Sequence, residues 1–557
     1  MRPMLCLLIF AVACSSSEGA PQCGEGGGSP PKNPFLADSI YAIPHGNSAQ
    51  QDSTLLAGPM GPTKTLSDEE RNYQQIGPGH FGIYISSPYA DGNRVVWTNG
   101  ADRIAKLSHD TFEVLAEYPL DPDNFPAATD DQIDAAIDAL DSNNCNEGIE
   151  SQSCMDLIAQ ASALASRYLT GLSGVYAQLD SDHTLYVGGS DRVTAYGEVD
   201  PADPTSAIEV KRVWPAGDTN LSDIVPGGLV GFNMTFDGWI IIVTDLGWMV
   251  ALSRDFQHVH TVQLNFADRD AQAHNEWVAS QVPPLRGFNW VRNPMAIDQE
   301  GGIFVASNDH MHRVMWMGDA FSLREEDGAW TEPYSNSRGL GTGATPSLVG
   351  FGDEDQFVVI TDGDEVMNMT YFWRDAIPEG WEQLAGMPSR RIAGQLPANF
   401  GDPNATEAQS EQSVVVAGYG AVVVNNQARN IPENFTGQTV LLFSSFLGND
   451  PLFQPFGMQK FEWDPEAQKL KEVWANTTIS SPNSVPYISR DSEMVYTVGA
   501  RDGLWTLEGV DFCGGRSNFH YVVGGSRYNS LFSGVHLDQG GWIIYGNPFG
   551  KLRLDIN

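Results

Sequence analysis

The chain has 557 residues, of which 41% are hydrophobic and 18% are charged, so it can bury a large core and is not disordered by composition. It carries 70 acidic against 31 basic residues, which gives a formal net charge of −39. This balance excludes nucleic acid as a partner, because binding to phosphates requires clustered Lys and Arg. The acidity is typical of a solvated surface that keeps an exported protein soluble.

The N-terminus has the pattern of an export signal. Arg2 precedes an apolar run, Leu5–Val12, and Ala11-Val12-Ala13-Cys14 follows the pattern of a bacterial lipoprotein cleavage box. We therefore expect residues 1–14 to be a signal peptide and Cys14 to become the lipidated first residue. A plain secretory peptide cut near Ala20 is the alternative. Both predict export, either to the bacterial cell envelope (outer membrane or periplasm) or to the medium.

The next two segments are polar and lack periodicity. Residues 15–34 are rich in Ser, Gly and Pro and predict a flexible tether, and residues 35–78 predict an irregular lead-in that wraps the domain. No later stretch approaches the roughly 18 to 20 unbroken apolar residues of a membrane span. Contact with a membrane is therefore expected only through the lipid anchor.

The stretch Gly231–Leu252 contains a pattern that recurs along the chain. Asp237-Gly238, a strong hairpin signal, separates two apolar runs, and a polar turn at Asp245 leads to a third. Similar units of about 50 to 70 residues follow one another over residues 79–557. The repetition predicts an all-β fold, a seven- or eight-bladed β-propeller with eight blades preferred. An array of β-sandwiches is the alternative.

The last unit ends after three strands, which leaves its sheet incomplete. A propeller must close its ring, since open blades would present unpaired sheet edges. We expect a segment near residues 80–86 to supply the missing outer strand.

Residues 121–172 interrupt the repeat. They are rich in Asp and Ala, with apolar residues spaced by three and four, and predict a helical hairpin insertion. Cys145 and Cys154 flank a short loop within it and are expected to form a disulfide, which suits an oxidising compartment. The sequence does not tell whether Cys23 and Cys513 pair.

Two series of polar residues are expected to meet at one mouth of the central channel. The innermost strand of each blade begins at the face that carries the loops between blades, and the turn after the second strand lies on that same face. The first series supplies amide and carboxylate oxygens, which suit a hard cation such as calcium. Its predicted metal ligands are Asn293, Glu411, Asn483 and Asn529. The predicted substrate-binding residues are Thr345, Asp245, Asp362 and Arg501.

Histidines are the natural candidates for proton transfer, because the ordinary pKa of histidine lies near neutrality. His310, with Asp309 beside it, follows a second strand and can face the channel mouth. We therefore predict His310 and Asp309 as catalytic residues. His80 and His274 are weaker candidates.

The phrases NPMAIDQEGGIFVAS and NMTFDGWIIIVTD resemble blades of the SMP-30/gluconolactonase and strictosidine-synthase-like propellers. The resemblance implies a calcium ion at the channel axis, held by a set such as Glu411, Asn293, Asn483 and Asp309, and hydrolysis of a lactone or ester. Those relatives have six blades and lack the helical insertion, so the chain departs from their pattern.

The sequence thus predicts an exported, monomeric propeller that binds a small molecule or glycan at the channel mouth. The leading functional hypothesis is a metal-assisted hydrolase of an ester or lactone. A non-catalytic surface module that binds a glycan or protein is one alternative, and an oxidoreductase or lyase on the same platform is another.

Overall fold

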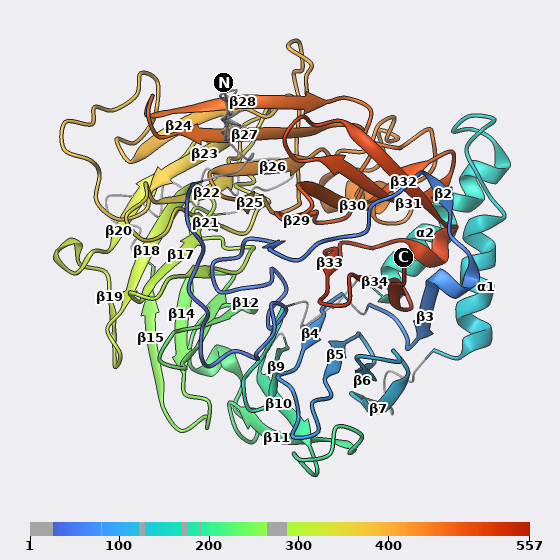
Figure 1. Cartoon of the computed structure of the whole chain (residues 1–557), viewed down its shortest axis with the longest axis horizontal. Coiled ribbons are helices and arrows are strands. Elements are labelled where there is room, and N and C mark those ends of the chain that lie inside the picture. The colour runs from blue at the N-terminus through green and yellow to red at the C-terminus, as the bar shows by residue number, and fades with distance from the viewer. Residues whose placement is uncertain are drawn as a thin grey trace, which may run out of the picture.

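The computed structural model of the protein describes residues 26–79, 81–121, 128–168, 176–189, 191–264 and 287–556. In these ranges the strands form eight sheets that follow one another around a common centre as the blades of a propeller (Figure 1). Within each blade the strands are ordered from the centre outward and pair in antiparallel fashion, apart from two short N-terminal strands that add to the seventh blade in parallel. The predicted all-β propeller is confirmed, and eight sheets agree with the preferred number of blades.

The first four blades take their strands from consecutive segments. Blade 1 contains β4 (Tyr84–Ile85), β5 (Val95–Asn99), β6 (Arg103–Ser108) and β7 (Val114–Pro119). Blade 2 contains β8 (Ala177–Leu179), β9 (Leu185–Gly188), β10 (Val193–Glu198) and β11 (Ile208–Trp214). Blade 3 contains β12 (Leu229–Met234), β13 (Ile240–Thr244), β14 (Trp248–Leu252) and β15 (Val259–Gln263). Blade 4 contains β16 (Ala296–Ile297), β17 (Gly302–Ala306), β18 (His310–Trp316), β19 (Phe321–Ser322) and β20 (Trp330–Pro333).

Blades 5 and 6 are also built from consecutive segments, whereas blades 7 and 8 contain additional strands from the N-terminal segment. Blade 5 contains β21 (Ser347–Val349), β22 (Phe357–Thr361), β23 (Asn368–Trp373) and β24 (Ile392–Pro397). Blade 6 contains β25 (Val415–Ala417), β26 (Gly420–Val424), β27 (Met458–Asp464) and β28 (Lys469–Asn476). Blade 7 contains β29 (Tyr487–Ser489), β30 (Met494–Arg501), β31 (Leu504–Asp511) and β32 (Ser517–Gly524), with β1 (Ser53–Thr54) and β2 (Lys64–Thr65) at its edges. Blade 8 contains β33 (His536–Leu537), β34 (Ile543–Asn547), β35 (Gly550–Leu554) and β3 (Arg71–Gln75).

The hairpin predicted around Asp237-Gly238 is confirmed between β12 and β13. Gly238 has φ +90°, a left-handed conformation that glycine adopts without strain, and its N–H donates to the Thr235 carbonyl. Every residue of β13 is buried, because the blade packs against a neighbour on each face.

The ring closes through β3, which pairs with β35 over Arg71–Gln75. The prediction that the N-terminal side supplies the missing outer strand is confirmed, but the predicted segment, residues 80–86, is wrong. Tyr84 and Ile85 instead form the innermost strand of blade 1. The closing strand is polar and only half-buried, as suits an outer position, so its sequence lacks the apolar pattern of the inner strands.

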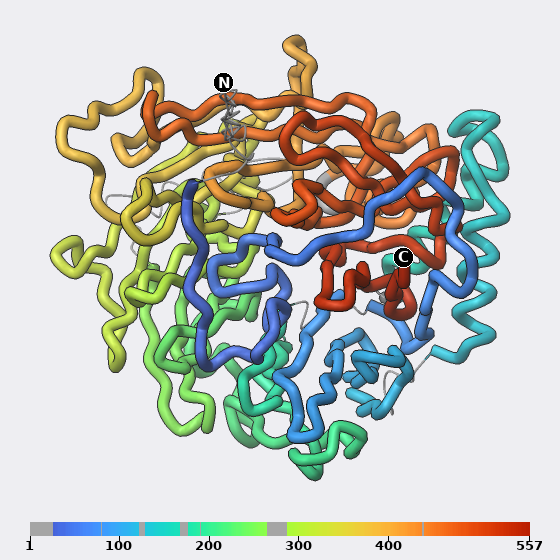
Figure 2. Tube along the Cα trace, viewed as in Figure 1, coloured from blue at the N-terminus to red at the C-terminus, as the bar shows by residue number. Residues whose placement is uncertain are grey.

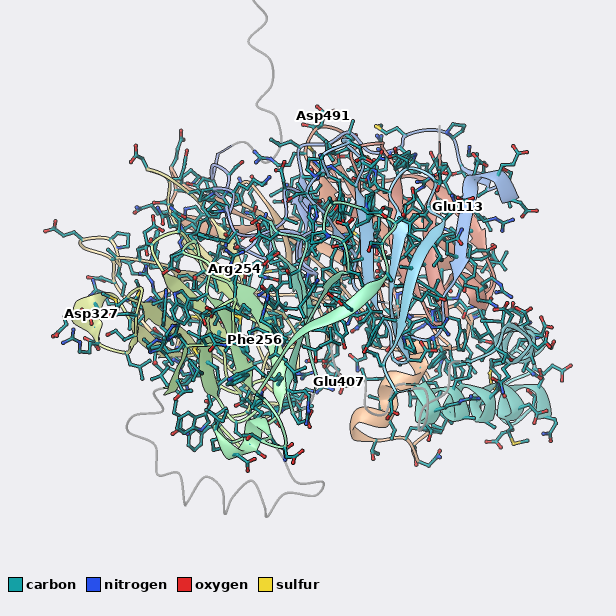
Figure 3. All side chains as sticks on the ribbon, turned by 90° about the horizontal axis from the view of Figure 1, so that it is seen from below. Glu113, Arg254, Phe256, Asp327, Glu407 and Asp491 are labelled. Carbon is teal, nitrogen blue, oxygen red and sulfur yellow. A yellow bond between two sulfur atoms is a disulfide. The ribbon has the colours of Figure 1, made fainter. Side chains whose placement is uncertain are left out.

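The two faces of the ring differ. The mouth face carries the loops between blades, including Glu407, together with α1 (Asp130–Asp141), α2 (Gln152–Tyr168) and α4 (Leu441–Ser445) (Figure 3). The plug face carries the opposite turns, including those at Glu113 and Asp491 (Figure 3).

Residues 33–54, which we call the plug, fill the middle of the ring (Figure 2). They contact the innermost strand of every one of the eight blades. In six blades a strand N–H donates to a plug carbonyl at 2.8–3.0 Å. The donor and acceptor pairs are Ile85 and Tyr41, Leu179 and Ala42, Ile297 and Ser48, Leu348 and Ala49, Val416 and Gln51, and Ile488 and Asp52. In the other two, the Asn33 amide donates to the Met234 carbonyl of β12 and the Tyr41 hydroxyl to the Leu537 carbonyl of β33.

The plug satisfies backbone groups that would otherwise be unpaired. Eight inner strands present free edges toward the axis, and each buried N–H without a partner is unfavourable. Residues 35–52 consist of turns and bends with one isolated bridge at Leu36, so they are irregular, but they lie inside the ring instead of wrapping around the domain (Figure 2). Residues 1–25, including Cys14 and Cys23, lie outside the described residues.

The predicted helical insertion is confirmed as α1 and α2. Thr129 caps α1 by accepting the Gln132 N–H, and Cys145 and Cys154 form the predicted disulfide. The apolar sides of the two helices pack on α4 and on Phe549 of blade 8. None of the helices in the described ranges is long and apolar enough to span a membrane.

Candidate functional site

A cavity of about 250 Å³ lies on the axis at the mouth face. Its floor is the plug, at Pro44 and His45. Its wall is formed mostly by residues that precede the innermost strands, together with Leu441 of α4. The wall includes two of the predicted ligands, Asn293 and Glu411.

A buried histidine–carboxylate pair stands at the floor of this cavity. His45 Nδ1 lies 2.7 Å from Asp52 Oδ2, and the two residues are 5% and 1% exposed. Burial raises the pKa of the Asp52 carboxyl, and the His45 imidazole opposes that rise. With Nδ1–H donated to Asp52, His45 Nε2 is free to accept a proton.

Two hydroxyls face His45 Nε2, Thr345 Oγ1 at 3.3 Å and Ser413 Oγ at 3.4 Å. Thr345 is fully buried, whereas Ser413 is 6% exposed and lines the cavity. A hydroxyl, a base and a carboxylate that orients the base form the arrangement used for nucleophilic catalysis. Thr345, predicted to bind substrate, lies behind the cavity wall and supports His45.

Several buried polar atoms at this site have no hydrogen-bond partner in the described part of the chain. They are Gln412 Nε2, His536 Nδ1 and Asp52 Oδ1. Gln412 and His536 both line the cavity. Burial lowers the pKa of His536 to about 3, and the charges of Lys551 and His45 add to this, so its imidazole is neutral at neutral pH. Leaving such groups unpaired costs about 1–3 kcal/mol each, which a ligand or water would recover.

The turn that enters the cavity from blade 8 has a strained backbone. Leu531 and Phe532 have φ of +43° and +67°, values that bulky residues rarely adopt. The Asn529 side chain holds the turn by accepting the Leu531 N–H at 2.9 Å. Phe532 lines the cavity as a result.

Asn483 and Asn529, two of the predicted metal ligands, bind each other instead of pointing to a common centre with Glu411. Asn483 Nδ2 donates to Asn529 Oδ1 at 2.8 Å, and both amides donate to the Ser445 carbonyl at the end of α4. Asn483 Oδ1 accepts the Ser530 hydroxyl at 2.6 Å. This buried network fixes α4 and the strained turn over the cavity.

The other two predicted ligands line the cavity but are also engaged. Glu411 forms an ion pair with Arg292, and Asn293 Nδ2 donates to the Thr342 carbonyl at 3.2 Å. Among the described residues, no group of three or more His, Cys, Asp and Glu side chains could hold a metal ion. The four side chains do not fit one calcium ion as they stand, and calcium stays a prediction.

The predicted catalytic pair and the turn residues lie on the mouth face but do not line the cavity formed by the described residues. His310 Nδ1 lies 2.7 Å from Asp309 Oδ1. The turns after the second strands stand one strand spacing, about 4.8 Å, further from the axis than the inner strands.

The three turn residues predicted to bind substrate have local partners. Asp245 accepts the Gly228 N–H at 2.9 Å, and Asp362 accepts the Asn368 N–H at 2.7 Å. Arg501 makes two bonds to Glu508, at 2.8 and 2.7 Å. These contacts stabilise the turns. His80 and His274 lie outside the described residues.

Sequence reasoning missed the plug residues His45 and Asp52. They belong to the run HGNSAQQD, which has neither helical nor strand periodicity and so was interpreted as part of a lead-in. The available signal was chemical: a histidine and an aspartate in a short polar run that lies outside the repeats.

Fold and cavity together define a β-propeller with a buried polar site at one channel mouth. No family model matches the chain. A protein of Archaeoglobus fulgidus, described as uncharacterized, is 30% identical over 536 residues, which cover 94% of this chain and 89% of the relative. The chain belongs to the same family as this archaeal protein.

Solved structures are similar in fold. Quinohemoprotein alcohol dehydrogenase ADHIIG from Pseudomonas putida HK5 is 10% identical, with a TM-score of 0.48, over 94% of this chain and 81% of that chain. A europium-containing methanol dehydrogenase is 11% identical, with a TM-score of 0.47, over 93% and 91%. BamB from Moraxella catarrhalis is 8% identical, with a TM-score of 0.38, over 68% and 94%. The resemblance to SMP-30-like propellers extends only to the propeller fold.

Proposed function

We propose that the protein is a hydrolase that cleaves an ester or lactone in the mouth cavity. Ser413 acts as nucleophile, His45 as general base and Asp52 as the residue that orients His45. The observation that supports this most strongly is the geometry of the three side chains, with His45 Nδ1 2.7 Å from Asp52 and Nε2 3.4 Å from the Ser413 hydroxyl.

The reaction follows from these positions. Ser413 Oγ attacks the carbonyl carbon while its proton passes to His45 Nε2, and the Asp52 carboxylate stabilises the imidazolium. The developing oxyanion accepts a hydrogen bond from Gln412 Nε2, a buried amide group for which the described residues provide no partner. His45 then gives the proton to the departing alkoxide. A water molecule, deprotonated by His45, attacks the acyl-enzyme, and its proton returns to Ser413 Oγ as the acid leaves.

A fluorophosphonate probe tests the nucleophile. Ser413 Oγ forms a bond to phosphorus as fluoride leaves and the proton passes to His45. We expect peptide mass spectrometry to find the label on Ser413. We also expect Ser413→Ala and His45→Ala to lose p-nitrophenyl acetate hydrolysis by at least about a hundredfold. Ser484→Ala, at the start of the inner strand of the next blade and outside the cavity lining, is the matched control.

Retention of both label and activity in Ser413→Ala would overturn the proposal. If a chelator then abolished the remaining activity, the metal-assisted route predicted from the sequence would replace it. Loading with calcium and measuring the shift in Tm would check that route directly.

A ligand-binding module without catalysis is the second candidate. The low exposure of His45 and Ser413, 5% and 6%, favours it, because a reacting carbonyl has little room to reach them. Under this hypothesis Ser413→Ala leaves ligand affinity unchanged and no serine is labelled. The oxidoreductase or lyase alternative stays a prediction.

We also propose that the protein is exported and anchored by a lipid on Cys14. The disulfide between Cys145 and Cys154 supports an oxidising compartment.

A further inference from the structure

The cavity wall is divided between two chemistries. The apolar part consists of Phe81, Leu441, Val485 and Phe532. The polar part consists of Tyr176, Asn293, Glu411, Gln412 and Ser413. Phe81, Val485 and Phe532 precede the inner strands of blades 1, 7 and 8, which are neighbours in the ring, so the apolar side chains occupy one arc of the mouth, to which Ser533 and His536 of blade 8 add polar atoms.

The backbone that carries Phe532, one residue of the apolar arc, has an unfavourable conformation. Leu531 and Phe532 are held in the left-handed region, where each residue carries about 1–3 kcal/mol of strain. A buried amide network from Asn483 and Asn529 holds this turn and α4, and α4 supplies Leu441. Strain that the surrounding structure maintains at a cavity is a mark of a ligand site, and here it presents an aromatic ring.

The polar side opposes the arc with fixed charges and amides. Glu411 is paired with Arg292, whose guanidinium lies 5.1 Å from the centre of the Trp290 ring. Burial raises the pKa of the Tyr176 hydroxyl, against the Arg292 charge and a hydrogen bond from Thr345, so the hydroxyl is protonated and available as a donor. Hydrogen-bonding groups on one side and apolar groups on the other select an amphipathic ligand.

We infer that this cavity takes a small ester or lactone with an aryl or short apolar group, seated against the Phe532 arc with its carbonyl toward Ser413. A cavity of about 250 Å³ exceeds the roughly 150 Å³ that encloses benzene, which leaves space for an aromatic ring and a few further atoms. A long acyl chain exceeds this volume and would have to extend out through the mouth. The assignment of an ester or lactone carbonyl rests on the proposed hydrolase function. The assignment of an aryl or short apolar group rests on the lining of the cavity alone.

The test uses a ligand that cannot be hydrolysed, 4-fluoroacetophenone, observed by 19F NMR with the whole protein. We expect it to bind the natural protein and the Ser413→Ala variant equally. We expect Phe532→Ala to weaken binding about tenfold or more, because an aromatic contact area is lost. Phe256→Ala is the matched control: Phe256 is also half-buried with φ +62°, but lies in the turn between β14 and β15, outside the cavity lining.

A second measurement compares p-nitrophenyl acetate with p-nitrophenyl octanoate. We expect kcat/KM to favour the acetate at least tenfold, and we expect Val485→Thr, which adds a hydroxyl to the arc at nearly the same size, to lower kcat/KM for the acetate without reversing this preference. Absence of 4-fluoroacetophenone binding, equal binding by Phe532→Ala, or preference for the octanoate would overturn the inference. Binding without any esterase activity would preserve the apolar site and refute only the hydrolase.

Discussion

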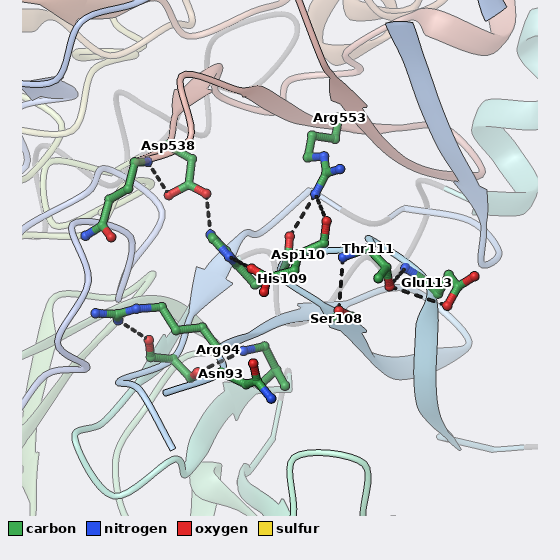
Figure 4. A network of polar contacts seen from close by, with 12 residues as sticks. Asn93, Arg94, Ser108, His109, Asp110, Thr111, Glu113, Asp538 and Arg553 are labelled. Atoms are coloured by element: carbon green, nitrogen blue, oxygen red, sulfur yellow. Dashed lines mark hydrogen bonds and ion pairs between the residues drawn. The ribbon is translucent and has the colours of Figure 1, made fainter. Parts of the chain in front are cut away.

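Polar side chains gather at both ends of the channel, but they are hydrogen-bonded to different extents. At the plug face, His109 contacts Asp538 and Asp110, and Arg553 donates to the His109 and Asp110 carbonyls at 2.8 and 3.0 Å (Figure 4). This network joins blade 1 to blade 8, beside the strand that closes the ring. Its polar groups are paired with one another, and Phe112, within its β6–β7 turn, has φ +62° and packs against Arg553.

At the mouth face the same residue types are left partly unpaired around a cavity. Gln412 Nε2 and His536 Nδ1 have no hydrogen-bond partner among the residues that the structure describes, and Phe532 is strained. The comparison teaches that converging polar residues do not by themselves mark a functional site. Unsatisfied buried atoms that surround a cavity are the better indicator, because a ligand in the cavity can pair with them.

The largest expected effect is a loss of stability when the plug-face network around Arg553 is broken. Arg553→Ala removes the bonds to two carbonyls, the ion pair with Asp555 and the packing on Trp542, 4.0 Å from the guanidinium carbon to the ring centre. We expect the free energy of unfolding in urea to fall by about 3 kcal/mol. Arg516→Ala, an exposed arginine 3.8 Å from Asp511, should change it by no more than about 0.5 kcal/mol. Equal effects would remove the contrast between a structural network and an ordinary surface pair.

A smaller effect of opposite sign is expected at the mouth. Gln412→Met keeps the side-chain size and removes the unpartnered amide, so the protein should gain about 1 kcal/mol of stability. Esterase kcat/KM should fall at least about tenfold, since the oxyanion donor is lost. Gln178→Met is the control, because Gln178 is buried and unpartnered but does not line the cavity. It should gain stability without losing activity, and a loss of stability in Gln412→Met would contradict the distinction.

The smallest effect is a pH dependence at the plug face. Burial alone would lower the pKa of His109, but the hydrogen bonds and charges of Asp538 and Asp110 raise it overall above its ordinary value of 6.5. A raised histidine pKa contributes stability that is fully present below about pH 6.5 and is lost as the pH rises through the folded-state value. His109→Gln should therefore lower Tm most at acidic pH, with the deficit shrinking toward alkaline pH. His258→Gln, an exposed histidine on the same face, should show no such trend.

The repeat was readable from the sequence because each blade buries both faces of its inner strands. That produces short apolar runs, such as Ile240–Thr244, separated by turns with Asp and Gly, and it predicted the propeller and the need for a closing strand from the N-terminal side, although not the segment that supplies it. The helices around Cys145 and Cys154 were equally readable from their spacing of apolar residues. Local periodicity carried these predictions.

The plug and its chemistry were not readable. Residues 33–54 satisfy inner-strand edges that exist only after eight blades have assembled, so their own sequence needs no periodicity. The partners of Asn483 and Asn529 were also set by tertiary structure, since α4 lies between blades and takes the bonds that a metal would have needed.

The sequence by itself determined the strands, the turns and the repetition, because these depend on contacts between residues close along the chain. Only the tertiary structure decided which side chains meet at the axis. It brought His45 to Ser413, 368 residues away, because the closed ring leaves one central space and the N-terminal segment fills it.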